Sequence, residues 1–249
     1  MTSTLTPGGS GPGQDDLDRL GRRVEDLATR LAHLTQQVEQ LRPRTDLVAV
    51  QEEQASRDTA DFIVEEMPTA EVLWHPHDTL RFGLSVLDVP GAVLEFGVAT
   101  GTTLGIIAHE VSEDRYVVGF DSFEGLPEAW RTGFPAGSYA QPPPLYVSGA
   151  EIVVGHFADT LPAFLLEHDE PIAFMHLDAD LYSSTRTVLD LVGDRLPAGA
   201  VLVFDEYFNY PGWRRHEHLA FRELIDRTGR GFDYLAYTGN HQQVVVRMH

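Results

Sequence analysis

Lysine is absent from this sequence, since each of its 18 basic residues is an arginine. This absence excludes the phosphate-binding lysine of P-loops, Schiff-base lysines and the tyrosine–lysine relay of short-chain dehydrogenases. Cysteine is absent as well, which excludes disulfides, thiolate catalysis and cysteine-ligated zinc. The sequence therefore cannot belong to the classes of enzyme and metalloprotein that depend on these residues.

Positive charge is scarce, because 18 basic residues face 38 acidic ones and leave a net charge of -20. A partner rich in phosphate would meet a repulsive field over most of the surface, so neither nucleic acid nor an anionic membrane is an expected partner. The sequence also lacks an apolar run of about 18 residues and the apolar core of a signal peptide. We therefore expect a soluble, cytoplasmic protein.

The N-terminal region predicts a tail and then a coiled coil. Residues 1–14 are small, polar and rich in glycine and proline, as in a disordered tail. Residues 15–43 carry apolar side chains at alternating steps of three and four, which predicts a coiled-coil helix and a homo-oligomer. The alternative is an amphipathic helix on the chain's own domain, which usually has a wider apolar stripe. The apolar positions are Leu17, Leu20, Val24, Leu27, Leu31, Leu34, Val38 and Leu41.

The rest of the chain predicts one α/β domain behind a small cap. Residues 44–88 read as helical pieces broken by prolines, which suits a cap or lid, and residues 89–249 alternate buried strands with helices. This alternation predicts a doubly wound, mostly parallel seven-stranded sheet that ends in an antiparallel hairpin. The expected strands are 92–97, 115–121, 151–157, 172–178, 200–206, 232–239 and 242–248.

A glycine-rich turn, LEFGVATGTTLG, follows the first long apolar strand. Dinucleotide sites use G-x-G-x-x-G, whereas Ala99 stands here at the second glycine position and Glu95 precedes the turn. A carboxylate repels a pyrophosphate but attracts the ammonium and sulfonium of S-adenosylmethionine, so the spacing favours that cofactor. Asp121 ends the next strand and suits the ribose of either cofactor. Taken alone, the turn is equally compatible with a purely structural role.

Acidic residues stand at the ends of two predicted strands. Asp178 and Asp180 stand at the end of the fourth strand, and Asp205 and Glu206 at the end of the fifth. Adjacent parallel strands lie about 4.8 Å apart, so these four side chains should converge. They would repel one another unless protons or a cation held them, and an all-oxygen set suits Mg²⁺ or Ca²⁺. The structural alternative is that Asp178 or Asp205 caps the following helix.

Five motifs in this order resemble the TylF-type, macrocin O-methyltransferase-like family of class I S-adenosylmethionine-dependent methyltransferases, over residues 60–249. The motifs are LEFGVATGTTL, GFDSFEGLPE, GHFADTLP, LDADLYSST and FDEYFNYPGW. The resemblance implies a Rossmann-like fold and Mg²⁺-dependent methylation of a hydroxyl on a sugar or aromatic natural product. It implies Asp178 and Asp205 as metal ligands, Glu206 in place of a second aspartate, and Asp180 as general base.

The candidate cofactor-binding residues are Glu95, Gly97, Ala99, Gly101, Thr102, Asp121, Ser122, Phe123, Phe157 and Asp178. His176 shares a strand face with Asp178 and is a second candidate for the catalytic base, or else a hydrogen-bonded residue behind the site. The expected partner is a small hydroxylated acceptor, which fold and motif cannot name. The alternative function is a non-catalytic S-adenosylmethionine-binding scaffold assembled through the coiled coil. A dehydrogenase is disfavoured by Ala99 and the absent lysine, and a hydrolase by the absence of G-x-S-x-G.

Overall fold

The computed structural model describes residues 14–41, 46–144 and 146–249. They divide into two compact units, the first ending at Val50 and the second running from Gln51 to His249. The predicted tail lies outside the described residues except for Gln14, and so does Pro43, where the coiled-coil pattern stops. Among the described helices, none combines the length and the apolar character needed to cross a bilayer.

Helix α1 (Gln14–Leu41) forms the first unit together with the start of helix α2 (Leu47–Glu66). It is one continuous helix, as the spacing of its apolar residues predicts. Five members of the apolar stripe are between 57% and 66% exposed, namely Leu20, Val24, Leu27, Leu31 and Leu34. The ion pair between Arg30 and Asp26 is exposed and adds little stability. The stripe therefore buries little of its surface within the helix's own unit.

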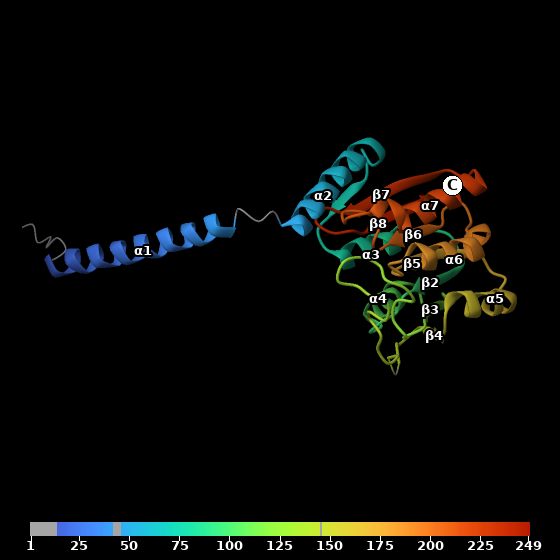
Figure 1. Cartoon of the computed structure of the whole chain (residues 1–249). Helices are drawn as coiled ribbons and strands as arrows, with labels where there is room; N and C mark the ends of the chain where they lie inside the picture. Colours follow the sequence, from blue (N-terminus) through green and yellow to red (C-terminus); the bar gives the residue numbers. More distant parts are fainter. Residues whose placement is uncertain (1–13, 42–45, 145) are drawn as a thin grey trace, which may run out of the picture. The chain divides into compact units, whose positions relative to one another are not determined.

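One eight-stranded sheet runs through the second unit, in the order β1-β7-β8-β6-β5-β2-β3-β4 (Figure 1). Strand β8 is antiparallel to both of its neighbours, and every other pair is parallel. The strands are β1 (Glu71–Leu73), β2 (Ala92–Phe96), β3 (Val117–Asp121), β4 (Glu151–Val154), β5 (Ile172–Leu177), β6 (Val201–Phe204), β7 (Phe232–Thr238) and β8 (Val244–Met248).

The mostly parallel sheet with an antiparallel C-terminal strand pair is confirmed, but the expected number of seven strands is wrong. The eighth strand is β1, which lies in the region predicted to be helical. Its three residues are too few to show a strand period, and it extends the sheet because Glu71–Leu73 pair with residues 236–238 of β7. Tertiary pairing therefore decides the conformation of this short segment.

Helices cover both faces of the sheet, because strand residues alternate between two apolar clusters. On one face, α3 (Pro76–Ser85) and α4 (Thr102–Glu110) pack on Val93, Phe174 and Val203. On the other face lie α5, α6 and α7. Their bounds are α5 (Phe157–Glu167), α6 (Tyr182–Val192) and α7 (Glu217–Thr228), and two short 3-10 helices span Gly193–Arg195 and Trp213–Arg215. This three-layer arrangement leaves the carboxyl ends of the parallel strands free to form a site.

Helix α2 is attached to the segment that follows β6. Phe62 packs edge-on against Trp213 at a ring distance of 5.2 Å, and the Arg214 guanidinium donates to both carboxylate oxygens of Asp58. Thr59 also accepts a hydrogen bond from the backbone N–H of Asn209. These contacts join α2 to residues that directly follow the acidic end of β6.

Candidate active site

The glycine-rich turn between β2 and α4 is fixed by backbone geometry. Gly97, Ala99 and Gly101 have positive φ angles of 96°, 46° and 78°. A Cβ atom at position 97 would lie 1.8 Å from the carbonyl oxygen of Asp178, so only glycine fits there. The turn is therefore pressed against the end of β5, where the predicted metal ligands begin.

Asp121 at the end of β3 holds this turn in place. Its Oδ2 accepts the backbone N–H groups of Val98 and Ala99, both at 2.8 Å, and its Oδ1 accepts the N–H of Phe123 at 2.7 Å. Charge-assisted hydrogen bonds of this kind are the stronger ones in proteins. Asp121 thus shapes the turn, and its expected contact with a ribose remains a prediction.

A cavity of about 530 Å³ opens at the carboxyl ends of the strands. The predicted residues that line it are Gly97, Ala99, Asp121, Ser122, Phe157, Asp178, Asp180 and Glu206. The predicted residues that are not among its described lining are Glu95, Gly101, Thr102, Phe123, His176 and Asp205. All described lining residues lie between Gly97 and Glu206, so the lid role of residues 44–88 remains a prediction.

Glu95 and His176 form a buried pair beneath the cavity. They face each other on β2 and β5, and the His176 Nδ1 atom lies 2.8 Å from Glu95 Oε1. Their side chains are 0% and 1% exposed. Burial raises the pKa of Glu95 and lowers that of His176, but the carboxylates of Asp205 and Glu95 outweigh burial and hold the pKa of His176 well above its usual value.

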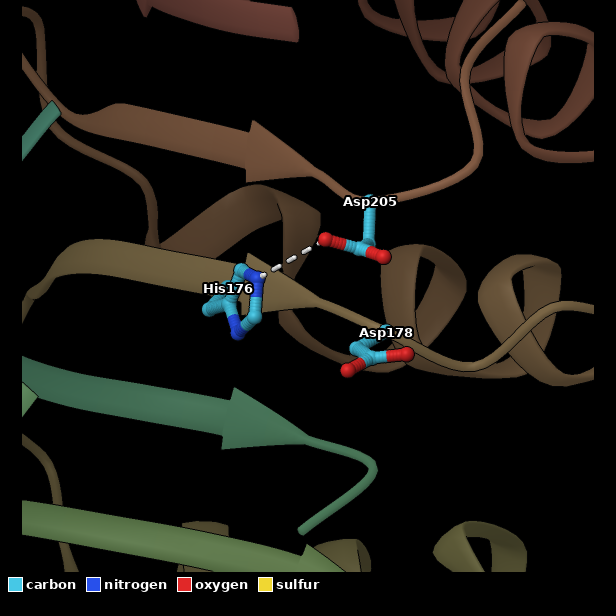
Figure 2. Close-up of side chains that lie close together, drawn as sticks. All are labelled: His176, Asp178 and Asp205. Atoms are coloured by element: carbon cyan, nitrogen blue, oxygen red, sulfur yellow. Dashed lines mark ion pairs between the residues drawn. The ribbon is translucent and has the colours of Figure 1, made fainter. Parts of the chain in front are cut away.

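Figure 2 shows that His176, Asp178 and Asp205 lie close together, with side chains of the types that bind metal ions. One ligand atom from each lies within 4.8 Å of the others, and all three come from the ends of the neighbouring strands β5 and β6. The His176 Nε2 atom lies 3.8 Å from Asp205 Oδ1, which is an ion-pair distance and too long for a hydrogen bond. The predicted convergence of Asp178 and Asp205 is thus present in the structure.

Besides Glu95, three further acids lie near this group, and one of them was missed by the sequence analysis. Burial and Asp205 raise the pKa of Asp180 to about 7 and hold that of Glu206 well above its usual value. Glu217, the missed acid, is fully buried, accepts the backbone N–H of Glu206 at 3.1 Å and has a pKa raised by burial to about 8. Its position in the segment HEHLAF indicated only a helix start.

The acids fit a divalent cation. Burial holds the pKa of Asp178 well above its usual value, and repulsion by the carboxylate of Asp205 raises it further. Within the described residues, the buried Oε2 atom of Glu206 has no hydrogen-bond partner. A hard cation would satisfy this oxygen and relieve the repulsion, and carboxylate oxygens are the ligands it prefers.

The outer part of the cavity carries hydroxyl groups that the sequence analysis did not name as site residues. Tyr139 projects from the loop after β3 with a φ of 67° and is 55% exposed. Ser183, Ser184 and Thr187 line the same cavity from α6, and Ser183 donates to Glu128 of the loop at 2.6 Å. Ser183 and Ser184 belong to the motif LDADLYSST, but nothing in that pattern indicates that their hydroxyls face a cavity. His156, a further missed lining residue, stands at the start of α5.

Comparison with known proteins finds a similarity to one family over part of the chain. Residues 94–207 match the model of a family described as a methyltransferase domain. The demethyldecarbamoylnovobiocin O-methyltransferase of Streptomyces niveus is 29% identical over 149 residues, which is 50% of this chain and 55% of that protein. The match therefore spans little more than half the length of this relative.

Solved structures agree on the fold. CalS11, a calicheamicin methyltransferase, is 25% identical with a TM-score of 0.58, and the match covers 82% of this chain and 93% of that one. A second structure of CalS11, described as a TDP-rhamnose 3'-O-methyltransferase, is also 25% identical, with a TM-score of 0.51 and coverages of 82% and 95%. The fold of this chain is thus shared with proteins named as methyltransferases.

Proposed function

We propose that this chain is a class I, S-adenosylmethionine-dependent O-methyltransferase of the TylF type, because its residues 94–207 match the model of a methyltransferase domain. Its acceptor is a hydroxyl on a sugar or aromatic natural product. The observation that carries the proposal is the convergence of the glycine-rich turn, Asp178 and Asp180 on one cavity. The names of the novobiocin and calicheamicin relatives support the acceptor class.

The turn and its neighbours suit a positively charged methyl donor. S-adenosylmethionine supplies a methyl group activated by its sulfonium, and the carboxylates of Asp121 and Asp178 line the cavity where it would lie. Phe157 and Ser122 line the same part of the cavity and are proposed to flank the nucleoside. Gly97 and Ala99 of the glycine-rich turn line this cavity, and Asp121 holds the turn through the N–H groups of Val98 and Ala99.

Transfer of the methyl group is an in-line displacement, and a neutral hydroxyl is a weak nucleophile. A cation held by Asp178, Asp205 and Glu206 would lower the pKa of the acceptor hydroxyl. Asp180 is proposed to accept the released proton, because it lines the cavity and its pKa of about 7 suits a base near neutral pH. The hydroxyls of Tyr139, Ser183 and Thr187 are placed to orient the acceptor.

We also propose that α1 joins copies of this chain. Its apolar stripe repeats every 3.5 residues and is exposed, and a second helix with the same repeat would bury it. The alternative of a non-catalytic scaffold shares this assembly but has no use for the acids at 178, 180 and 205. The presence of all three, grouped at the carboxyl ends of β5 and β6, favours the enzyme.

The experiment is a transfer assay with S-adenosylmethionine labelled on its methyl group. The full chain is incubated with a panel of glycosides and catechols, with Mg²⁺ or with EDTA. Label in a product with Mg²⁺ and little label with EDTA is the expected result. Binding of the cofactor without transfer to any member of either class would support the scaffold instead.

A further inference from the structure

Asp205 accepts a hydrogen bond from Gln243, a residue that lies outside the sequence motifs. Gln243 stands directly before β8, is 4% exposed, and donates from its Nε2 atom to Asp205 Oδ1 at 3.1 Å. Phe204 and Val244 pair across β6 and β8, so Asp205 and Gln243 are neighbours at the end of that pairing. The Gln243 Oε1 atom accepts the backbone N–H of Gln242 at 3.3 Å, which fixes the orientation of the carboxamide.

The same oxygen of Asp205 faces His176. The His176 Nε2 atom lies 3.8 Å from Asp205 Oδ1, and Figure 2 shows the second oxygen of Asp205 directed away from the ring. The opposite side of the ring is bound to Glu95 at 2.8 Å. Neither Glu95 nor His176 is among the described residues that line the cavity, so neither is placed to touch cofactor or acceptor.

A purely structural role accounts poorly for these polar groups. Glu95 and His176 continue a sheet face whose preceding positions are Val93 and Phe174, and apolar residues fill the cluster beneath α3 and α4. Burying a charged pair in such a face costs more desolvation free energy than packing apolar side chains of similar volume. Within the described residues, the second oxygen of Glu95 also lacks a hydrogen-bond partner. Packing alone therefore does not explain why Glu95 and His176 occupy these positions.

We propose that Glu95, His176 and Gln243 are positioning residues that hold Asp205 through its Oδ1 atom and present its Oδ2 atom to a divalent cation. The inference rests on the metal-assisted form of the proposed function. The inference gives Glu95 a role in metal binding, although Glu95 lies only two residues before the glycine-rich turn. Outer partners of this kind orient a ligand, and their loss weakens metal binding about 10- to 100-fold.

The test is calorimetric titration of the full chain with Mn²⁺ in the presence of S-adenosylmethionine. Gln243→Leu removes the donor to Asp205, and Glu95→Gln keeps the side-chain shape but weakens the charge-assisted hydrogen bond to His176. Each variant should bind Mn²⁺ about 10- to 100-fold more weakly, and Gln243→Leu should bind S-adenosylmethionine with unchanged affinity. Gln242→Leu, one residue away on the same turn, is the matched control and should bind both as the wild type does.

Three outcomes would overturn the inference. The first is unchanged Mn²⁺ affinity in both folded variants, with folding checked by thermal unfolding. The second is electron spin-echo modulation from a nitrogen bound directly to Mn²⁺ that disappears in His176→Gln while persisting in His156→Gln, because His176 would then be a ligand. The third is a wild-type chain that binds no Mn²⁺, and its affinity for S-adenosylmethionine would then show whether the methyltransferase proposal survives.

Discussion

Gly97 and Asp178 touch through their backbones, and this contact joins the glycine-rich turn to the proposed metal site. A Cβ atom at Gly97 would lie 1.8 Å from the Asp178 carbonyl oxygen, and the Asp178 N–H donates to the carbonyl of Phe96 at 2.9 Å. The ends of β2 and β5 are therefore locked together. A displacement of the glycine-rich turn would therefore also displace Asp178.

Gly97→Ala should abolish binding of S-adenosylmethionine. The added methyl group collides with backbone atoms that cannot move independently, and the φ of 96° is costly for alanine. The matched control is Gly105→Ala in α4, because a Cβ atom there meets nothing within 4 Å. That control should keep binding and gain about 0.5 to 1 kcal/mol of stability. Calorimetric titration and thermal unfolding of both variants check this, and normal binding by Gly97→Ala would contradict it.

Asp180→Asn should lower turnover about 10²- to 10⁴-fold while leaving cofactor affinity unchanged. Asparagine has the same shape and tolerates the left-handed backbone that Asp180 adopts at a φ of 57°, so only the proton-accepting group is lost. The measurement is initial rate with the best acceptor from the transfer assay. Ser183→Ala, which removes a lining hydroxyl, should instead raise KM more than it lowers kcat. Equal turnover by Asp180→Asn and the wild type would exclude Asp180 as the base.

The metal-free protein should lose stability as the pH rises from about 4 to about 8. Burial raises the pKa of Asp180 from 3.8 to about 7 and that of Glu217 from 4.5 to about 8, so the folded chain holds protons that the unfolded chain has released. Their contribution is present below the ordinary values and is lost as the pH rises through the raised ones. Thermal unfolding in EDTA should show this fall. Mg²⁺ should offset it above pH 7, and identical profiles with and without the ion would argue against a cation among these acids.

Deleting residues 1–43 should lower the oligomeric state. The exposed stripe from Leu20 to Leu34 is the surface proposed to join copies of the chain. Sedimentation velocity of the full and shortened chains measures the change, with circular dichroism to confirm that the sheet domain stays folded. In the full chain, Leu27→Asp should act as the deletion does, since it places a charge in the middle of the stripe. An unchanged molecular mass in both variants would refute self-association through α1.

Much of the fold could be predicted because its buried strands are continuous apolar runs. Strands β2, β3, β5 and β6 follow such runs, and Asp121, Asp178 and Asp205 lie at or just beyond their ends, as expected. Strand β1 could not be predicted, because three residues carry no period and pairing with β7 decides their conformation.

The surroundings of the site were less accessible to sequence analysis, because they depend on sheet order. Gln243 lies 38 residues after Asp205 and reaches it only because β8 inserts between β6 and β7. Glu217 belongs to a helix start, where an acid ordinarily signals capping, yet here it is buried beside Glu206. Neither position has a local pattern that indicates its partner.

The central claim is that a cavity lined with carboxylates binds a positively charged methyl donor and, beside it, a divalent cation. Calorimetric titration of the full chain, first with S-adenosylmethionine and then with Mg²⁺, tests it most directly. The same two titrations are carried out on Asp205→Asn. The account predicts cofactor binding in all cases and Mg²⁺ binding only in the wild type. Absence of cofactor binding, or equal Mg²⁺ binding by Asp205→Asn and the wild type, would contradict it.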